Sequence, residues 1–254
     1  ALLASDAADA VVVTHGTDTL EETAFFLELV RASDKPVVLV GAMRPSDALS
    51  ADGPMNLRNA VVVAASAASQ GRGVLAVMNE DIHAARWVQK TSASGVQAFS
   101  SPQQGPVGAV VGRLPVYGAA PSPVDGQHFQ TLPTDSLPRV DILMAYAGAD
   151  GAMVKDAVKR GARGIVLAGV GNGNASKDVL AELAAAAKKG VLVVRTSRVG
   201  RGFIEENLEV DDKASGFAAN TSLTPQKARV LLQMLLANRT TDIQAVRAAF
   251  NGWR

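Results

Sequence analysis

The sequence contains no cysteine, which excludes disulfides, thiol catalysis and cysteine-ligated metals. Only 4% of the residues are aromatic, and the net charge is +1 without a long run of one sign. These features exclude the stacking platforms and the basic surface typical of a nucleic-acid-binding protein. No apolar run is long enough to cross a membrane. The histidines at 15, 83 and 128 lack metal-ligand spacing. We therefore expect neither a nucleic acid nor a membrane as partner.

Strands and helices alternate in the first half of the chain. With 254 residues, of which 48% are hydrophobic, the chain can bury the core of one large domain or two smaller ones. Apolar runs typical of buried strands alternate with segments of helical period, whereas residues 79–106 show no clear helical period. The predicted strands are 11–13, 36–40 and 74–78, the predicted helices 20–32 and 54–69, and the predicted hairpin 107–116.

A second alternating unit follows a proline-rich stretch, which we interpret as a linker at 118–137. The predicted strands are 140–144, 164–168 and 191–194, and the predicted helices are 152–160, 177–189 after Ser176 as N-cap, one that begins with Thr224 and Pro225, and a last one with Ile243 and Phe250. The sequence thus predicts an α/β protein of two domains, 1–117 and 138–254, each a mainly parallel sheet flanked by helices.

The helix predicted at 20–32 presents a broad apolar face that could cover a sheet. This face consists of Leu20, Ala24, Phe26, Leu27 and Val30. Phe25 and Leu29 fall on the other side, where an apolar pair could contact another subunit.

The loop at 14–19 gathers two kinds of polar group where the first strand ends, and ligands bind at this edge of an open α/β sheet. Thr17 and Asp18 contribute a hydroxyl and a carboxylate, and Thr19 with Glu22 predicts a capping box. The alternative is that Thr17 and Asp18 only satisfy the backbone of a tight turn. His15 is interpreted as a packed loop residue rather than a ligand.

Lys90 is a candidate partner for this loop. A lysine placed beside a threonine hydroxyl can act as its base, so Thr17, Lys90 and Asp18 could form a hydroxyl, base and carboxylate group. The alternative is a solvated surface lysine.

The segment Gly169-Val-Gly171-Asn-Gly173-Asn174 follows a strand and precedes a helix, as a dinucleotide fingerprint does. However, Asn174 stands where Gly or Ala is expected, and Arg195 rather than an acid follows the next strand. An NADP-type oxidoreductase is kept as a weaker hypothesis on this segment alone.

Several motifs resemble the bacterial L-asparaginase family, which includes glutaminase-asparaginases. The resemblance covers essentially the whole chain and is closest to the exported, type II branch, which implies the periplasm. The matching segments are His15-Gly-Thr17-Asp18-Thr19, Glu21-Glu22-Thr23, Val40-Gly-Ala-Met-Arg44-Pro, Ser50-Ala-Asp52-Gly-Pro54-Met-Asn56, Gln89-Lys90-Thr91, Gly169 to Asn174, Glu209-Val-Asp-Asp212 and Pro225-Gln-Lys-Ala-Arg229.

The resemblance implies a catalytic group of Thr17, Asp18 and Lys90 in a threonine amidohydrolase that needs no metal or cofactor. Asp18 would bind the substrate's α-amino group, and the loop of Thr17 and Asp18 its α-carboxylate. Asn174 and Glu209 would reach the active site of a partner subunit in a homotetramer, a dimer of close dimers.

One part of the family pattern does not occur before Val11. Family members begin with a strand and a Gly-Gly-Thr-Ile motif that carries the first catalytic threonine, then a mobile loop with a tyrosine and a later Ser-Gln pair. We expect the sequence to lack this N-terminal segment, and with it the primary nucleophile. The predicted function is an L-asparagine amidohydrolase that forms L-aspartate and ammonia, with L-glutamine as a further substrate to test. The alternative is a non-catalytic amino-acid-binding relic of the same fold.

Overall fold

The structure is a computed structural model, and it describes residues 7–119, 128–129, 136–220 and 222–253. The chain divides into two compact units, 1–124 and 125–254, which are described one at a time. Most of the predicted linker, 118–137, lies outside the described residues, so its bounds stay a prediction.

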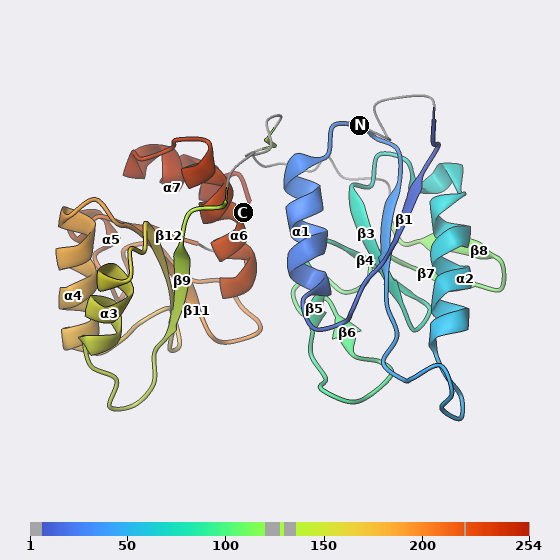
Figure 1. Cartoon of the computed structure of the whole chain (residues 1–254), viewed down its shortest axis with the longest axis horizontal. Coiled ribbons are helices and arrows are strands. Elements are labelled where there is room, and N and C mark those ends of the chain that lie inside the picture. The colour runs from blue at the N-terminus through green and yellow to red at the C-terminus, as the bar shows by residue number, and fades with distance from the viewer. Residues whose placement is uncertain (1–6, 120–127, 130–135, 221, 254) are drawn as a thin grey trace. The chain divides into compact units, whose positions relative to one another are not determined.

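The first unit contains a six-stranded sheet in the order β1-β2-β3-β4-β7-β8 (Figure 1). Its first three strands are parallel, and the other three join by antiparallel pairs. A separate two-stranded ribbon pairs β5 with β6. The strands are β1 Val11–Thr14, β2 Val37–Val40, β3 Val74–Met78, β4 Asp81–Ala84, β5 Gln89–Lys90, β6 Phe99–Ser100, β7 Gly108–Val111 and β8 Leu114–Tyr117.

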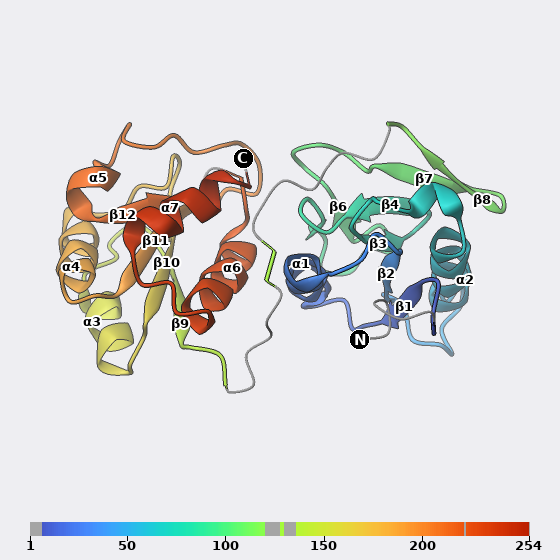
Figure 2. The same ribbon diagram turned by 90° about the horizontal axis from the view of Figure 1, so that it is seen from above.

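Helices α1 (Leu20–Val30) and α2 (Gly53–Ala64) cover opposite faces of this sheet (Figures 1 and 2). Alternation along β2 explains the two layers, because Val37 and Leu39 pack in the cluster that includes α1, and Val38 and Val40 pack with α2. Both faces of the central strands are therefore apolar, as in other sheets covered by helices on both sides. The predicted helix 54–69 is split into α2 and the short 3-10 helix η2 (Ala67–Ser69).

The buried stripe of α1 differs from the predicted one. Phe25 and Leu29 are both fully buried, so the predicted outward pair is wrong. Phe26, Leu27 and Val30 are only half-buried. The buried residues of the helix are Leu20, Glu21, Ala24, Phe25, Glu28 and Leu29.

Two glutamates explain this rotation, because they lie at the centre of the buried arc. Glu28 is 2% exposed, and its Oε2 accepts a hydrogen bond from the backbone nitrogen of Val74 at 2.6 Å. Glu21 is 6% exposed and accepts from the backbone nitrogen of Lys90 at 2.6 Å. A buried carboxylate is tolerated when it is hydrogen-bonded in this way. The sequence pattern counts both glutamates as solvent-facing and so turns the helix the wrong way.

Strand β8 is an edge of the sheet and exposes Leu114 and Val116 by 69% and 53%. It pairs with β7 in a hairpin that confirms the prediction for 107–116. Pro115 lies between the two exposed side chains, opposite Val110. The turn at Gly112, with φ +66°, closes the hairpin.

The second unit is a four-stranded, fully parallel sheet in the order β12-β11-β10-β9. Helices α3 and α4 lie on one face and α6 on the other (Figure 2). Ser176 and Thr224 cap α4 and α6 as predicted, each accepting a backbone hydrogen bond. The predicted α/β class is confirmed. The elements are β9 Val140–Met144, α3 Ala152–Lys159, β10 Gly164–Gly169, α4 Lys177–Lys188, β11 Leu192–Ser197, α5 Asp212–Ser215, β12 Phe217–Ala219, α6 Pro225–Ala237 and α7 Ile243–Asn251.

Candidate active site

The loop at 14–19 leaves the carboxyl end of β1 and leads directly into α1. The backbone nitrogen of His15 donates to Val40 O at 2.8 Å, which extends the β1–β2 pairing into the loop. Thr19 is the N-cap of α1, but its side chain makes no capping hydrogen bond, so the predicted capping box is wrong. Only the backbone oxygen of Thr19 serves the helix start, accepting from Glu22 and Thr23 at 3.1 Å.

His15 braces this loop against α1. Its Nδ1 lies 2.6 Å from the carbonyl oxygen of Gly16, which can only accept, so Nδ1 carries the proton. In the neutral ring, Nε2 then accepts from the Thr23 hydroxyl at 3.0 Å. The two contacts account for the ring as a packed loop residue.

Lys90 brings the polar groups of the loop together. Its Nζ donates to Thr17 Oγ1 at 3.0 Å and to Asp18 Oδ1 at 2.6 Å. The Lys90 side chain is 18% exposed, whereas that of Asp18 is 93% exposed. The hydrogen bond from Lys90, and next its positive charge, hold the pKa of Asp18 below the usual value. The arrangement places a hydroxyl and a carboxylate on one amine, with the carboxylate open to a ligand.

The position of Lys90 depends on a residue that the sequence reasoning missed. Lys90 lies on β5, where it pairs with Phe99 of β6. Its backbone nitrogen also donates to the buried Glu21 carboxylate of α1. Glu21 therefore holds the Lys90 backbone from the first turn of the helix that follows Thr17. An acidic residue within the motif 21–23 is the one signal in the sequence, but it is equally typical of a helix start.

Motif residues after β2 hold the loop that follows this strand, next to the Thr17 loop. Asp52 accepts from the backbone nitrogens of Met43 and Arg44 at 2.9 Å and from Asn56 Nδ2 at 3.0 Å. Burial alone would raise the pKa of Asp52, but these hydrogen bonds outweigh it and hold the pKa below the usual value. The carboxylate thus stabilises the loop that follows β2.

Asn56 joins this loop to the next strand end. Its Nδ2 also donates to Gly41 O at 3.1 Å, and its Oδ1 accepts from the backbone nitrogen of Asn79 at 3.0 Å. Gly41 packs closely under the loop, since an added Cβ would lie 2.7 Å from the His15 carbonyl oxygen and 3.1 Å from Thr17 Cγ2. A larger residue there would displace Thr17, so the glycine is needed for space.

In the second unit, Asn174 and Glu209 meet at the carboxyl edge of the sheet. Asn174 Nδ2 donates to Glu209 Oε2 at 3.0 Å, and Asn174 Oδ1 accepts from the backbone nitrogen of Ala175 at 2.8 Å. The structure thus forms two groups of the predicted site residues, Thr17, Asp18 and Lys90 in one unit and Asn174 and Glu209 in the other. Their roles stay predictions.

The Gly-rich loop, residues 169–174, doubles back on itself after β10. Backbone hydrogen bonds of 2.8 Å join Val170 and Asn174 in both directions. Gly173 has φ +76°, and an added Cβ would lie 2.8 Å from Arg195 Nη1. An added Cβ on Gly169 would clash with Gly173. The glycines therefore allow the loop to pack on the sheet.

Arg195 is not available for the cofactor phosphate that an NADP-type site would bind through an arginine. The side chain is fully buried and donates to both carboxylate oxygens of Asp212, at 2.7 and 2.6 Å. Its remaining contacts are the carbonyl oxygens of Asn172 and, at 2.8 Å, Glu205.

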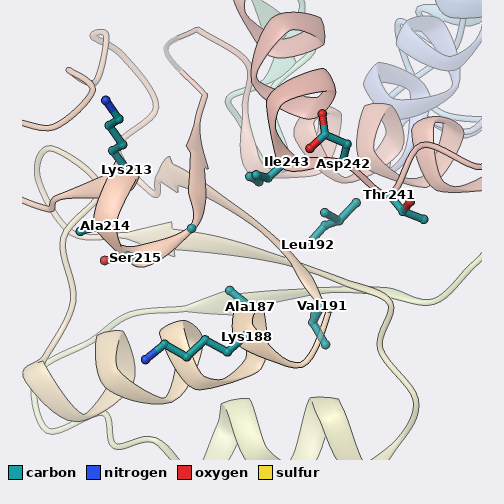
Figure 3. A pocket seen from close by; sticks show the side chains of 12 residues that line it. Ala187, Lys188, Val191, Leu192, Lys213, Ala214, Ser215, Thr241, Asp242 and Ile243 are labelled. Carbon is teal, nitrogen blue, oxygen red and sulfur yellow. The ribbon is translucent and has the colours of Figure 1, made fainter.

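A cavity of about 410 Å³ lies at the other edge of the second unit's sheet, by Val191 and Leu192 at the start of β11. Figure 3 shows that its walls come from the end of α4, from α5 and from the start of α7. None of the predicted site residues lines it. Among the described residues, no cluster of His, Asp and Glu could hold a metal ion, and no helix is long and apolar enough to span a membrane.

Comparisons with known proteins match both halves of the chain. The family model described as "Asparaginase, N-terminal" matches residues 1–121, and that described as "Glutaminase/Asparaginase C-terminal domain" matches residues 139–250. The chain is 49% identical to L-asparaginase 2 of Escherichia coli (strain K12), over 97% of this chain and 71% of that protein.

Two further relatives extend the comparison. The chain is 48% identical to the probable periplasmic L-asparaginase of Haemophilus influenzae, over 95% of this chain and 70% of that protein. It is 41% identical to the glutaminase-asparaginase of Pseudomonas fluorescens biotype A, over 95% and 67%. The chain thus spans about two thirds to seven tenths of the length of these relatives. With both family models matched in order and close relatives over nearly its whole length, the chain belongs to the asparaginase family.

Proposed function

We propose that the chain is an L-asparagine amidohydrolase, which converts L-asparagine and water to L-aspartate and ammonia. The observation that carries the proposal is the contact of Lys90 Nζ with both Thr17 Oγ1 and Asp18 Oδ1. Relatives named L-asparaginase and glutaminase-asparaginase support the reaction class and make L-glutamine the second substrate to test.

In the proposed reaction, Lys90 in its neutral form takes the proton of the Thr17 hydroxyl, and Thr17 in turn takes the proton of the nucleophilic hydroxyl that attacks the side-chain amide carbon. This nucleophile is the threonine that the family resemblance leads us to expect in the segment before Val11. The proton passes to the leaving nitrogen as the carbon–nitrogen bond breaks, so that ammonia is released. Water then hydrolyses the acyl group to the second carboxylate of L-aspartate. Lys90 is suited to this role because its amine lies within hydrogen-bonding distance of the hydroxyl.

Asp18 is proposed to bind the α-amino group of the substrate. Its carboxylate is largely exposed and carries its charge at neutral pH, since its pKa is held below the usual value. A bound ammonium would compete with Lys90 for this carboxylate, while the Lys90 amine stays within hydrogen-bonding distance of the Thr17 hydroxyl.

Asn174 and Glu209 are proposed to complete the substrate site of a partner subunit in a homotetramer. The proposal rests on the family resemblance and on the hydrogen bond that already pairs the two side chains. An isologous interface would create two equivalent shared sites per dimer.

The test is ammonia release from L-asparagine and L-glutamine by the purified chain and two variants of Thr17. Thr17→Val removes the hydroxyl but keeps the branched shape, and we expect it to lower kcat by about 10³-fold or more. Thr17→Ser keeps the hydroxyl and should retain most of the activity. Equal activity of the Val variant and the wild type would overturn the proposed role of Thr17. Binding of L-asparagine without ammonia release would support the amino-acid-binding alternative instead.

A further inference from the structure

Two loops of the second unit depend on one buried side chain. The Gly-rich loop carries Asn174, and the acidic loop, residues 205–211, carries Glu209. The Arg195 guanidinium donates to a backbone carbonyl of each loop, Asn172 O in the first and Glu205 O in the second. The same side chain, which lies on β11, therefore joins both loops to the sheet.

Arg195 is itself held by a charge partner in the interior. Both Arg195 and Asp212 are fully buried, and two parallel hydrogen bonds of 2.7 and 2.6 Å join them. Asp212 Oδ2 also accepts from the backbone nitrogen of Asn207, at 2.9 Å, within the acidic loop. A bidentate pair of this kind has one geometry, so it transmits a defined position to whatever it contacts.

Additional contacts keep the two loops in register. Asn172 Oδ1 accepts from the backbone nitrogen of Glu205 at 2.8 Å, which joins the loops directly. The Ser197 hydroxyl donates to Gly171 O at 2.7 Å at the end of β11. These contacts leave the side chains of Asn174 and Glu209 to meet each other at 3.0 Å.

A lysine could not replace this arginine. Arg195 serves four acceptor oxygens on three segments of the chain, and it does so with a planar fork of donors. A lysine amine is a single point that can approach the Asp212 carboxylate but cannot also reach both carbonyls in the same plane.

We infer that Arg195 is a positioning residue for substrate binding: through Asp212 and the carbonyls of Asn172 and Glu205, it sets the spacing of Asn174 and Glu209. This inference rests on the proposed function, since it assumes that Asn174 and Glu209 contact the substrate. It assigns Arg195 an effect on the affinity for substrate and not on the chemical step.

The first readout needs no catalytic activity. In Arg195→Lys, we expect hydrogen exchange at the amides of Glu205 and Asn207 to accelerate by about tenfold or more, because their acceptors lose position. Amides of β10 and β11 should change by less than about threefold. Arg139→Lys is the control, because Arg139 also donates two hydrogen bonds to an aspartate, both to Asp141 Oδ2, but lies outside both loops and is 44% exposed.

The second readout is the kinetics of ammonia release. KM for L-asparagine should rise by about tenfold in Arg195→Lys while kcat changes by less than about threefold, and Arg139→Lys should match the wild type. A fall in kcat without a change in KM, or no change in either constant, would overturn the inference. If Arg195→Lys shows the loop-specific acceleration of exchange but the wild type does not hydrolyse L-asparagine, the result counts against the proposed function. The role of Arg195 in positioning the two loops would then stand.

A second variant keeps the test decisive where Arg195→Lys does not fold. The double substitution Arg195→Met with Asp212→Leu removes both charges, so that no unpaired charge is left in the interior, and such replacements commonly fold. It also removes the hydrogen bonds of these two side chains with Asn172 O, Glu205 O and the Asn207 amide. The same loop-specific acceleration and the same rise in KM are expected. Uniform acceleration of strand and loop amides, or slow exchange at Glu205 and Asn207, would overturn the inference.

Discussion

The Thr17 loop and the Gly-rich loop each follow the carboxyl end of a parallel strand, but charged residues serve them in opposite ways. In the first unit the ion pair of Lys90 and Asp18 lies at the surface, with Asp18 93% exposed. In the second unit the ion pair of Arg195 and Asp212 is 0% exposed on both sides. An exposed pair can be reached by a ligand and contributes little to folding, whereas a buried pair cannot be reached and strongly penalises the loss of one partner.

Under the proposed function, an ion pair of Lys and Asp takes part in the chemistry in one place, and an ion pair of Arg and Asp holds the geometry of loops in the other. The charge of Asp18 is positioned by one lysine, so a substrate can compete for it. The Asp212 carboxylate accepts hydrogen bonds from Arg195 and from the Asn207 amide, so its position is fixed. Variants in the first unit should therefore change activity with little effect on stability, whereas variants of the buried pair should lower stability as well as the affinity for substrate.

The sharpest test of the exposed site is Lys90→Met. The substitution keeps much of the side chain but removes the amine, so we expect ammonia release to fall by about 10³-fold or more with the unfolding midpoint nearly unchanged. Lys155→Met is the matched control, because Lys155 makes a solvent-exposed pair with Glu182 on the helical face of the second unit. Near-normal activity of Lys90→Met would make Lys90 a surface lysine.

The buried site should respond in stability. Asp212→Ala leaves the Arg195 charge unpaired in the interior, which should lower the free energy of unfolding by about 3–5 kcal/mol. Asp141→Ala removes the partner of the partly exposed Arg139 and should cost about 0–1 kcal/mol. Urea unfolding of both variants at neutral pH measures the difference. Equal losses would remove the contrast between the exposed and the buried pair.

Asp18→Asn tests recognition at the exposed site. It keeps the shape of the side chain but removes the charge proposed to pair with the substrate ammonium, so kcat/KM should fall by about 10- to 100-fold. Initial rates across a range of L-asparagine concentrations measure this ratio. Kinetics identical to the wild type would leave Asp18 as a residue of the helix start.

Mixing of two inactive variants tests whether the two kinds of site meet across subunits. Lys90→Met and Glu209→Ala chains are combined under conditions that allow subunit exchange. Random pairing makes half of the dimers hybrid, and one of their two sites is intact, so about a quarter of the wild-type activity should return. Native mass spectrometry establishes that hybrids form. Hybrids without activity would place each whole site within one chain.

The smallest expected effect is the pH dependence of the stability that Asp52 contributes to the first unit. The pKa of Asp52 in the folded chain lies below its usual value of 3.8, so its contribution to stability is complete above that pH and is lost as the pH falls through the folded value. We expect Asp52→Asn to be less stable than the wild type at pH 7 by no more than about 1 kcal/mol, and the gap to narrow below about pH 3.8. Urea unfolding at pH 7 and pH 3 measures both gaps, and a gap that widens on acidification would contradict the assigned direction.

The strands were the most predictable part of the fold, and the reason is physical. Strands β3 and β9 match their predicted bounds, because both are unbroken runs dominated by apolar side chains next to a turn. Strand β4 is not among the predicted strands, since the buried His83 interrupts its apolar pattern. Its Nδ1 is hydrogen-bonded to Ser101 Oγ at 2.9 Å, so the burial depends on a partner distant in the sequence.

The members of the candidate site were predicted from the sequence, but the residues that hold them in place were not. Thr17, Asp18 and Lys90 come from motifs, and the structure brings them together. Glu21 and Arg195 have the charge of surface residues, and only the folded chain shows which backbone groups they meet. A sequence pattern reports the polarity of a side chain but not the burial of its partners, so positioning residues of this kind are the ones that such reasoning omits.

Strand β8 has a consequence for the behaviour of the protein in concentrated solution. An edge strand with exposed Leu114 and Val116 offers backbone donors and acceptors to a second molecule. The two-residue turn of the hairpin places Pro115 opposite Val110 at a position that makes no ladder hydrogen bond, so the nitrogen of Pro115 faces the open edge. Because proline has no N–H group, the edge lacks one of the donors that a templated stack of strands requires. We therefore expect this proline to hinder edge-to-edge pairing through β8.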